Sequence, residues 1–290
     1  MKSNHSRWAA LSLVIVTMIW GGTFIIVRTA VHTAGPLAFV GTRFAVAAVV
    51  AAAVNRRQLR GFSSLELGAG IAIGLCIFAG YSLQTLGLQY ITSSKSAFIT
   101  AFYVPTVPLL QWLFQRQQPH IAALAGAAIS FVGLTCLAGP EGIQGGFGYG
   151  EMLTALGALA ISAEIILIGH FAQRVNIARV TVTQLAVASL LSFAAMPVAG
   201  ERLPGVAPLF FACALALGMA SAAIQYVMNW AQRQVSATKA TLIYAGEPVW
   251  AGLIGLLAGE HIPALAGLGA AMIILASLMG KLGKSKPANA

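Results

Sequence analysis

The chain has 290 residues, a net charge of +10, 58% hydrophobic residues and only 8% charged residues. An average soluble domain carries about 25% charged residues, so this composition excludes an aqueous globular fold and indicates an integral membrane protein. The basic residues lie in short segments between apolar runs, which argues against a continuous face for nucleic acid.

Ten apolar runs of about 20 residues follow one another along the chain, each long enough to cross a bilayer as a helix. The connections between them are short and leave no room for a soluble domain, so we expect any binding to take place among the helices. The first run is long enough to span and does not read as a cleaved signal. The sequence predicts an all-α integral membrane protein with spans at 8–30, 37–54, 65–90, 95–115, 120–139, 149–170, 180–199, 206–232, 238–258 and 263–281.

The lysines and arginines predict the orientation of these spans. Short cytoplasmic loops of membrane proteins are enriched in basic residues. Most of the basic residues of this chain fall on one side if both termini are placed in the cytoplasm. An even number of spans with two cytoplasmic termini is therefore the predicted topology.

Two stretches of the chain follow the same plan. Residues 93–108 and 236–250 each begin with small polar residues and a lysine, continue with aromatic residues and reach a proline, so that Lys95 matches Lys239 and Pro105 matches Pro248. We therefore predict two repeats, 1–140 with spans one to five and 141–290 with spans six to ten. Since five is odd, the second repeat enters the membrane from the opposite side, as in many secondary transporters.

Five short motifs occur in order along the chain and carry a family resemblance. They are Trp20-Gly21-Gly22-Thr23-Phe24, Pro36 with Arg43-Phe44, Gly87-Leu88 through Lys95, Glu247-Pro248-Val249-Trp250, and Gly259-Glu260. With them the whole chain resembles the drug/metabolite transporter superfamily, of the ten-span type built from two EamA-like repeats. Within it, the chain is most similar to bacterial inner-membrane exporters of aromatic amino acids, which implies a secondary transporter of that membrane. One departure is Gln117, where many first repeats carry glutamate.

Three ionisable residues, Arg43, Glu164 and Glu247, fall clearly within the predicted spans. Such residues are costly in a bilayer and usually face the bundle interior or a wet cavity. A continuous helix would place Glu247 on one face with Lys239 and Ile243, so Glu247 either lines a substrate or proton site or pairs structurally. Glu164 is a second candidate for the pathway, and we expect Arg43 to pair with one of the two glutamates.

Pro248 directly follows Glu247 in the ninth span. It has no backbone N–H to donate to the carbonyl of Tyr244, so we expect the helix to bend there and to leave that carbonyl free for water or substrate. Pro105 is expected to act in the same way in the fourth span. The two prolines are the candidate hinges.

Polar and aromatic residues within the spans suggest the lining of a pathway. Ser221, Gln225, Asn229 and Gln232 recur along one face of the eighth span, either as a wall facing water or as interhelical hydrogen-bonding residues. The candidate substrate-binding residues are Trp20, Thr23, Tyr81, Gln84, Tyr103, Glu164, Gln225, Asn229, Tyr244 and Glu247, and the candidate residues of the two mouths are Lys95 and Lys239.

Such a cavity, with aromatic walls, few charges and several hydrogen-bonding groups, suits an aromatic or other large neutral amino acid. The alternatives are an exporter of drugs or other amphiphilic metabolites, and a channel. An enzyme is disfavoured because the chain has no aspartate and its histidines fall at span ends or outside. Cys76, Cys136 and Cys213 lack metal spacing, and no Gly-rich ATP loop is present. We therefore expect no cofactor or metal, and only the substrate and the lipid bilayer as partners.

Overall fold

The computed structural model describes residues 2–31, 34–116, 121–143, 148–205, 207–257 and 264–279. Within these residues the regular secondary structure is entirely helical. The helices are α1 (Lys2–Val31), α2 (Pro36–Asn55), the 3-10 helix η1 (Arg56–Gln58), α3 (Ser64–Gly87), α4 (Ser93–Thr100), α5 (Tyr103–Gln115), α6 (Ile121–Ile143), α7 (Tyr149–Phe171), α8 (Ile177–Ala195), α9 (Pro208–Ala231), α10 (Ala237–Tyr244), α11 (Glu247–Leu257) and α12 (Ala266–Met279).

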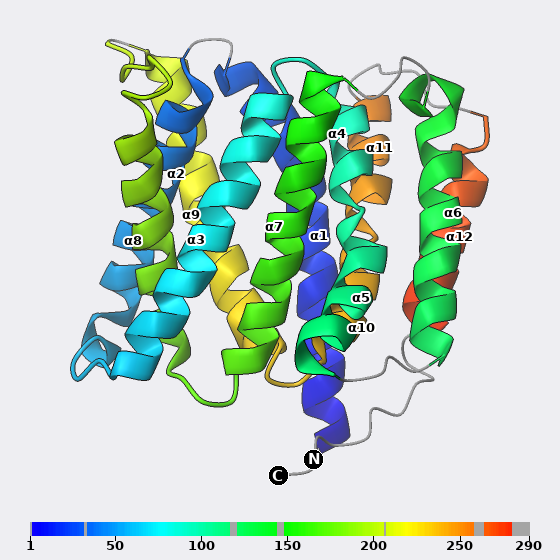
Figure 1. The fold of residues 1–290 in the computed structure, drawn as a ribbon, viewed down its shortest axis with the longest axis horizontal. Helices are drawn as coiled ribbons and strands as arrows, with labels where there is room; N and C mark the ends of the chain where they lie inside the picture. The colour runs from blue at the N-terminus through cyan, green and yellow to red at the C-terminus, as the bar shows by residue number, and fades with distance from the viewer. Residues whose placement is uncertain are drawn as a thin grey trace.

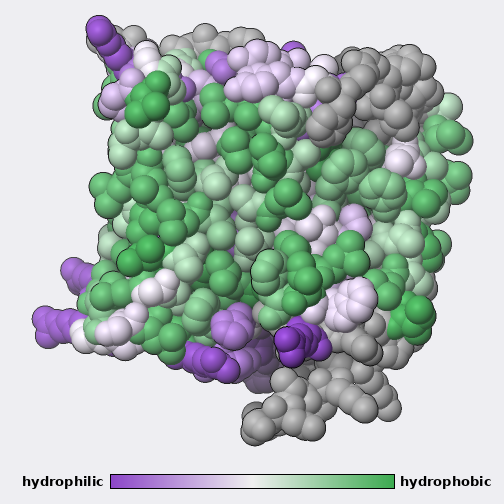
Figure 2. Space-filling view, viewed as in Figure 1, coloured by the Kyte–Doolittle hydropathy of each residue, from purple (hydrophilic) through white to green (hydrophobic). Residues whose placement is uncertain are grey.

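Eight helical segments of the described residues are long and apolar enough to cross a membrane. Figure 2 shows hydrophobic residues over the middle of one face, with hydrophilic residues gathered toward its two ends. Helices α6 and α12 contribute the shorter apolar stretches Leu124–Cys136 and Gly267–Ala276, so ten spans stay a prediction. The eight segments are His5–Val31, Pro36–Gln58, Ser64–Gly87, Lys95–Phe114, Tyr149–Phe171, Ile177–Ala195, Pro208–Ala231 and Ala237–Leu257.

Two of the predicted spans are broken near their middle. The fourth consists of α4 and α5 with a turn at Ala101 and Phe102, and the ninth consists of α10 and α11 with a turn at Ala245 and Gly246. The break in α10–α11 overturns the expectation that Lys239, Ile243 and Glu247 share one continuous helix face. Both breaks lie just before a proline, in line with the missing N–H of Pro105 and Pro248.

The two broken helices also begin alike. The hydroxyl of Thr92 accepts a hydrogen bond from the backbone N–H of Lys95 at 3.3 Å, and the hydroxyl of Ser236 accepts one from Lys239 at 3.4 Å. Each hydroxyl satisfies one of the N–H groups that the first turn of a helix leaves without a backbone acceptor. The residues before each lysine therefore start the helix.

The helices pack in a reciprocal arrangement. Helix α3 contacts α7 and α8, while α9 contacts α1 and α2; α1 packs on α11 as α7 packs on α5. Helix α2 also contacts α8, and α6 contacts α12 at the edge of the molecule in Figure 1. Such reciprocal contacts are the pattern that two equivalent halves would make, with α1–α6 answering to α7–α12.

Glycines allow the closest helix contact, between α3 and α7. A Cβ atom on Gly87 would lie 2.3 Å from the hydroxyl oxygen of Thr154, and one on Gly157 would lie 2.9 Å from the carbonyl oxygen of Gly80. Any side chain there would force the helices apart, so small residues are needed for this approach of two backbones.

Candidate functional site

The polar stripe of α9 points into the protein. Ser221, Gln225, Asn229 and Gln232 are all at most 5% exposed. The first three donate or accept hydrogen bonds with side chains of α2, α7 or α8. Gln232 directly follows α9, and its side-chain amide lies near the hydroxyl of Tyr244. The stripe therefore faces other helices rather than lipid.

Arg43 of α2 is buried beside the start of this stripe. Its Nε donates to the hydroxyl of Ser221 at 2.7 Å, and its guanidinium carbon lies 5.2 Å from the ring centre of Tyr81 and 5.4 Å from that of Phe44. Both rings lie within the range of a cation–π contact. The expectation that Arg43 pairs with Glu164 or Glu247 is wrong, because neither carboxylate lies within 4.0 Å of it.

Glu164 of α7 lies at the end of a chain of amides. The Nε2 of Gln225 donates to Glu164 Oε1 at 2.8 Å, and the Nε2 of Gln184 donates to Gln225 Oε1 at 2.7 Å. The Nδ2 of Asn229 reaches Gln184 Oε1 and the hydroxyl of Thr181, each at 3.3 Å. The donors thus follow one another toward the carboxylate, which the amide chain holds in place.

Gln184 and Thr181 of α8 were not among the predicted site residues. They lie three residues apart in α8 and are fully buried. That spacing places both on one helix face, and it is the sequence signal that could have indicated them.

Ser221 and Gln225 bring the two buried charges close to each other. They lie on adjacent turns of α9, and a turn advances about 5.4 Å along the axis. Ser221 holds Arg43 and Gln225 holds Glu164. The side chains that hold Arg43 and Glu164 therefore lie on neighbouring turns of α9, while Arg43 and Glu164 themselves form no ion pair with each other.

Glu247 has a different environment, at the break between α10 and α11. The hydroxyl oxygen of Tyr103 lies 2.9 Å from the carbonyl oxygen of Tyr244 and 3.1 Å from Glu247 Oε2. The carbonyl is the one that Pro248 leaves without its helical donor. It was predicted to be free for water or substrate, but a tyrosine from the other half of the chain occupies it.

Aromatic side chains surround these groups. The rings of Trp20 and Tyr244 meet edge to face with their centres 5.3 Å apart. Trp20, Tyr81, Tyr103 and Tyr244 belong to one buried cluster, and Tyr81 lies close enough to Glu164 and Glu247 to interact with both electrostatically. The indole N–H of Trp20 lies near the hydroxyl of Tyr81, and the hydroxyl of Tyr244 lies near the side-chain amide of Gln232. Among the described residues neither contact has full hydrogen-bond geometry, so both groups can also bond to water or ligand.

The other predicted residues lie apart from this cluster or use their polar atoms locally. The hydroxyl of Thr23 donates to the carbonyl of Trp20 on its own helix at 2.8 Å, and Gln84 Nε2 donates to the hydroxyl of Thr100 at 2.9 Å. Lys95 forms an ion pair of 2.5 Å with Glu151, joining α4 to α7. Lys239 lies in the first turn of α10.

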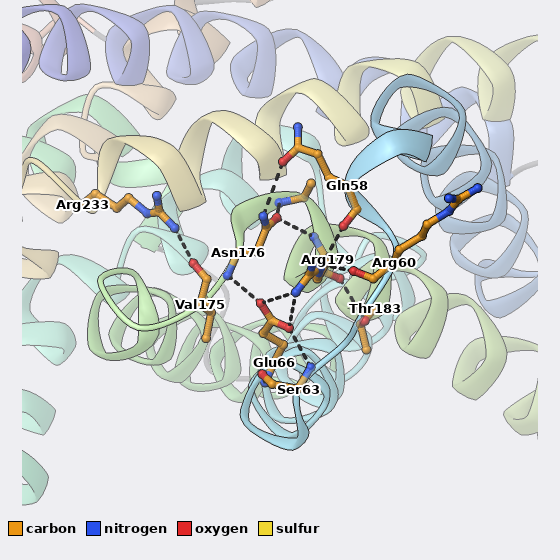
Figure 3. A network of polar contacts seen from close by, with 10 residues as sticks. Gln58, Arg60, Ser63, Glu66, Val175, Asn176, Arg179, Thr183 and Arg233 are labelled. Carbon is orange, nitrogen blue, oxygen red and sulfur yellow. Dashed lines mark hydrogen bonds and ion pairs between the residues drawn. The ribbon is translucent and has the colours of Figure 1, made fainter.

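A second polar network, not predicted from the sequence, joins the α2–α3 connection to the start of α8 (Figure 3). Arg179 Nη1 lies 3.0 Å from Glu66 Oε2, and its other nitrogens donate to the carbonyls of Gln58 at 2.8 Å and Arg60 at 2.5 Å. Glu66 Oε1 also accepts from the backbone N–H of Asn176 at 3.0 Å. The network fastens the α2–α3 connection to the start of α8 and satisfies its own charges.

The described residues include no group of three or more His, Cys, Asp or Glu side chains that could hold a metal ion. The cysteines Cys76, Cys136 and Cys213 are free thiols. Near the centre, the polar groups of the described residues are the N–H and O–H groups of the aromatic cluster and the carboxyl groups of Glu164 and Glu247. They suit hydrogen bonding to a small molecule.

Comparisons with known proteins also indicate a transporter. The sequence model of the EamA-like transporter family matches residues 7–139 and 148–279. An uncharacterized transporter of Archaeoglobus fulgidus is 28% identical over 276 residues, covering 95% of this chain and 86% of that protein. The uncharacterized inner membrane transporter YedA of Escherichia coli K12 is 28% identical over 283 residues, covering 94% of this chain and 90% of YedA.

The fold has a solved counterpart. One crystal structure superposes on this chain with a TM-score of 0.77, covering 94% of this chain and 98% of the other. The two sequences are 19% identical, so the likeness concerns the fold alone.

Proposed function

Because this chain belongs to the EamA-like transporter family, we propose that it is a secondary transporter for amino acids, aromatic or other large neutral ones, or for similar small zwitterions. It exports them across the bacterial inner membrane by alternating access. The transporter character follows from the family, and a relative is named an inner membrane transporter. Amino acids, outward direction and mechanism are the proposal.

One observation carries the choice of substrate. Arg43 of α2 and Glu164 of α7 are buried and bond to Ser221 and Gln225, which lie on neighbouring turns of α9, yet Arg43 and Glu164 form no ion pair with each other. An isolated charge in a membrane interior costs several kcal/mol. A zwitterionic amino acid carries an anion and a cation on one carbon, so it can offset both charges at once. The nearby rings of Trp20, Tyr81 and Tyr244 then receive a large apolar side chain.

Alternating access rests on the two halves of the chain. The family model matches twice, both halves contain a helix broken before a proline, and the helix contacts are reciprocal. We propose that residues 1–140 and 141–290 are inverted repeats of five spans. Rocking between them would open the central site to each side in turn. Pro105 and Pro248 act as hinges, and Lys95 and Lys239 lie at opposite mouths.

The orientation proposal follows the basic loops. Arg60, Arg179 and Arg233 lie together at the end where α1 begins. Because basic loops favour the cytoplasm, we propose that the N-terminus lies there and that Lys95 and Glu151 lie on the outer side.

The central experiment is counterflow of labelled amino acids in proteoliposomes. We expect aromatic and large neutral amino acids to exchange, and we expect analogues without the carboxylate or without the ammonium group to exchange poorly. Arg43→Gln should weaken amino acid binding about 10- to 100-fold, the range of a charged hydrogen bond. Arg28→Gln is the matched control, because Arg28 is exposed at the end of α1.

The same panel separates the alternatives. An exporter of cationic drugs would bind amines through Glu164 and would tolerate Arg43→Gln. A channel would show no acceleration by substrate on the opposite side. Either result would overturn the amino acid proposal.

A further inference from the structure

The contacts of the Tyr103 hydroxyl link the protonation of Glu247 to the hydrogen bonding of the Tyr244 carbonyl. Its oxygen is within hydrogen-bonding distance of two groups, the carbonyl oxygen of Tyr244 at 2.9 Å and Glu247 Oε2 at 3.1 Å. A carbonyl can only accept, and a phenol has a single proton to donate. If the phenol donates to the carbonyl, a bond to Glu247 forms only when the carboxyl group is protonated and donates to the phenol oxygen.

The alternative arrangement leaves a buried group unsatisfied. If Glu247 is a carboxylate, it competes with the Tyr244 carbonyl for the one proton of Tyr103. The carbonyl then has no donor, since Pro248 has no N–H to offer. A buried carbonyl without a donor costs about 1 to 3 kcal/mol. The protonation of Glu247 is thus linked to the hydrogen bonding at the break between α10 and α11.

We propose that Glu247 carries the coupling proton of the transporter. When protonated, it completes a chain from Glu247 to Tyr103 to the Tyr244 carbonyl and stabilises the break as observed. When the proton leaves to water, Tyr103 turns to the carboxylate and the Tyr244 carbonyl is released. The inference rests on the proposed function, in which a proton moving inward drives a substrate outward.

Neither of the ion pairs found among the described residues involves Glu247. Tyr103 of α5 bonds to it, Tyr81 of α3 is within electrostatic range, and Trp20 is the aromatic contributed by α1 next to Tyr244. Among the elements packed on α11, α4 carries Lys95, which is paired with Glu151. Glu164 of α7 is held by Gln225. Lys239 starts α10, a full helix before the break.

The place of Glu247 in the proposed repeat suits this role. Tyr103 and Glu247 each begin the second segment of a broken helix, 144 residues apart, and they touch each other. Corresponding segments of two related halves that touch each other lie near the axis between the halves. A group on that axis stays central while the halves rock, so it can take a proton from one side and release it to the other.

The test uses proteoliposomes containing the full chain, with two assays on the same vesicles. Counterflow without a pH gradient measures transport itself, and accumulation under an imposed pH gradient measures coupling. Wild type should exchange substrate in the first assay and accumulate it at least several-fold in the second. Glu247→Gln should lose the response to the pH gradient, and its residual exchange should no longer vary with pH.

Infrared difference spectroscopy on purified protein without substrate measures the protonation of the carboxyl group independently of transport. A carbonyl stretching band of a protonated carboxyl group should be present at neutral pH in wild type and in Glu164→Gln, and absent in Glu247→Gln. Tyr103→Phe keeps the carboxyl group, so its band should remain but shift in frequency as the hydrogen bond is lost.

The possible failures are distinguishable. If wild type exchanges amino acids but ignores the pH gradient, or if the band persists in Glu247→Gln, the proton proposal is overturned and the proposed function stands. If wild type shows no counterflow of any amino acid, the proposed function fails, and the infrared band alone decides whether Glu247 holds a proton.

Discussion

In both broken helices a proline leaves a carbonyl without its helical donor, but a different kind of group donates to each carbonyl. In α4–α5 the carbonyl of Ala101 lies four residues before Pro105 and accepts from the backbone N–H of Val104 at 2.9 Å. In α10–α11 the equivalent carbonyl of Tyr244 accepts from the side chain of Tyr103 in the other half. The first break is closed by its own backbone, whereas the second depends on a residue 141 positions away. Chemistry at Glu247 can therefore reach only the second.

The largest expected effect comes from the prolines, and it tests this difference directly. Pro248→Ala supplies an N–H that can bond the Tyr244 carbonyl and straighten the helix, a preference of up to about 3 kcal/mol, or about 100-fold in conformational equilibrium. Pro105→Ala should do much less, because the Ala101 carbonyl already has a donor. Counterflow rates of both variants in proteoliposomes provide the comparison. Equal losses would show that the two breaks are not different in kind.

Removing one hydroxyl at each break should also have unequal effects. Tyr103→Phe leaves both the Tyr244 carbonyl and Glu247 without their partner, which we expect to lower the free energy of unfolding by about 1 to 3 kcal/mol. Thr100→Val removes only the bond from Gln84, a half-buried side chain that can turn elsewhere. Thermal unfolding of the purified variants measures both. A larger loss in Thr100→Val would contradict the comparison.

Helix α1 packs on α11 beside the second break, and two neighbouring glycines of α1 allow a matched comparison. A Cβ on Gly21 would lie 2.7 Å from the backbone nitrogen of Ala251 and from Trp250 Cβ, whereas one on Gly22 would meet Ile254 Cδ1 at 3.5 Å. Gly21→Ala should therefore push α11 away from α1 and cost about 1 to 2 kcal/mol in the same unfolding assay. Gly22→Ala, at ordinary contact distance, should be close to neutral, and an equal loss in both would argue against close packing here.

The smallest effect is expected at the mouth of the first broken helix. Lys95 and Glu151 pair at 2.5 Å with side chains 16% and 10% exposed. A double-mutant cycle with Lys95→Gln and Glu151→Gln should give a coupling of about 1 kcal/mol, read as a modest change in counterflow rate. A coupling near zero would mean that this pair does not help to hold α4 against α7.

The sequence predicted the framework of the fold well, because apolar runs of membrane length have few alternatives. The repeat of lysine and proline in residues 93–108 and 236–250 also indicated the two broken helices. The sequence did not predict the geometry of the second break. A proline predicts a missing backbone donor, but it does not predict a turn two residues earlier. The shared face of Lys239 and Glu247 was the error that followed.

The site could be predicted only in part. The stripe on α9 is a local pattern, so Gln225 and Asn229 were found, but their partner Gln184 depends on how α8 packs. Attraction between opposite charges predicted a glutamate as the partner of Arg43. The packing of the helices instead places Arg43 against the hydroxyl of Ser221 and two aromatic rings. The contact of Tyr103 with Glu247 joins residues 144 positions apart, and no local pattern encodes such a contact.

The Arg179 network has a mechanical consequence. It fastens the α2–α3 connection to the start of α8, and α2, α3 and α8 also pack on one another. These three helices form one fastened unit, although α2 and α3 belong to the first proposed repeat and α8 belongs to the second. In the proposed alternating access we therefore expect the broken helices α4–α5 and α10–α11 to carry the displacement, so that the parts that move would not coincide with the two proposed repeats.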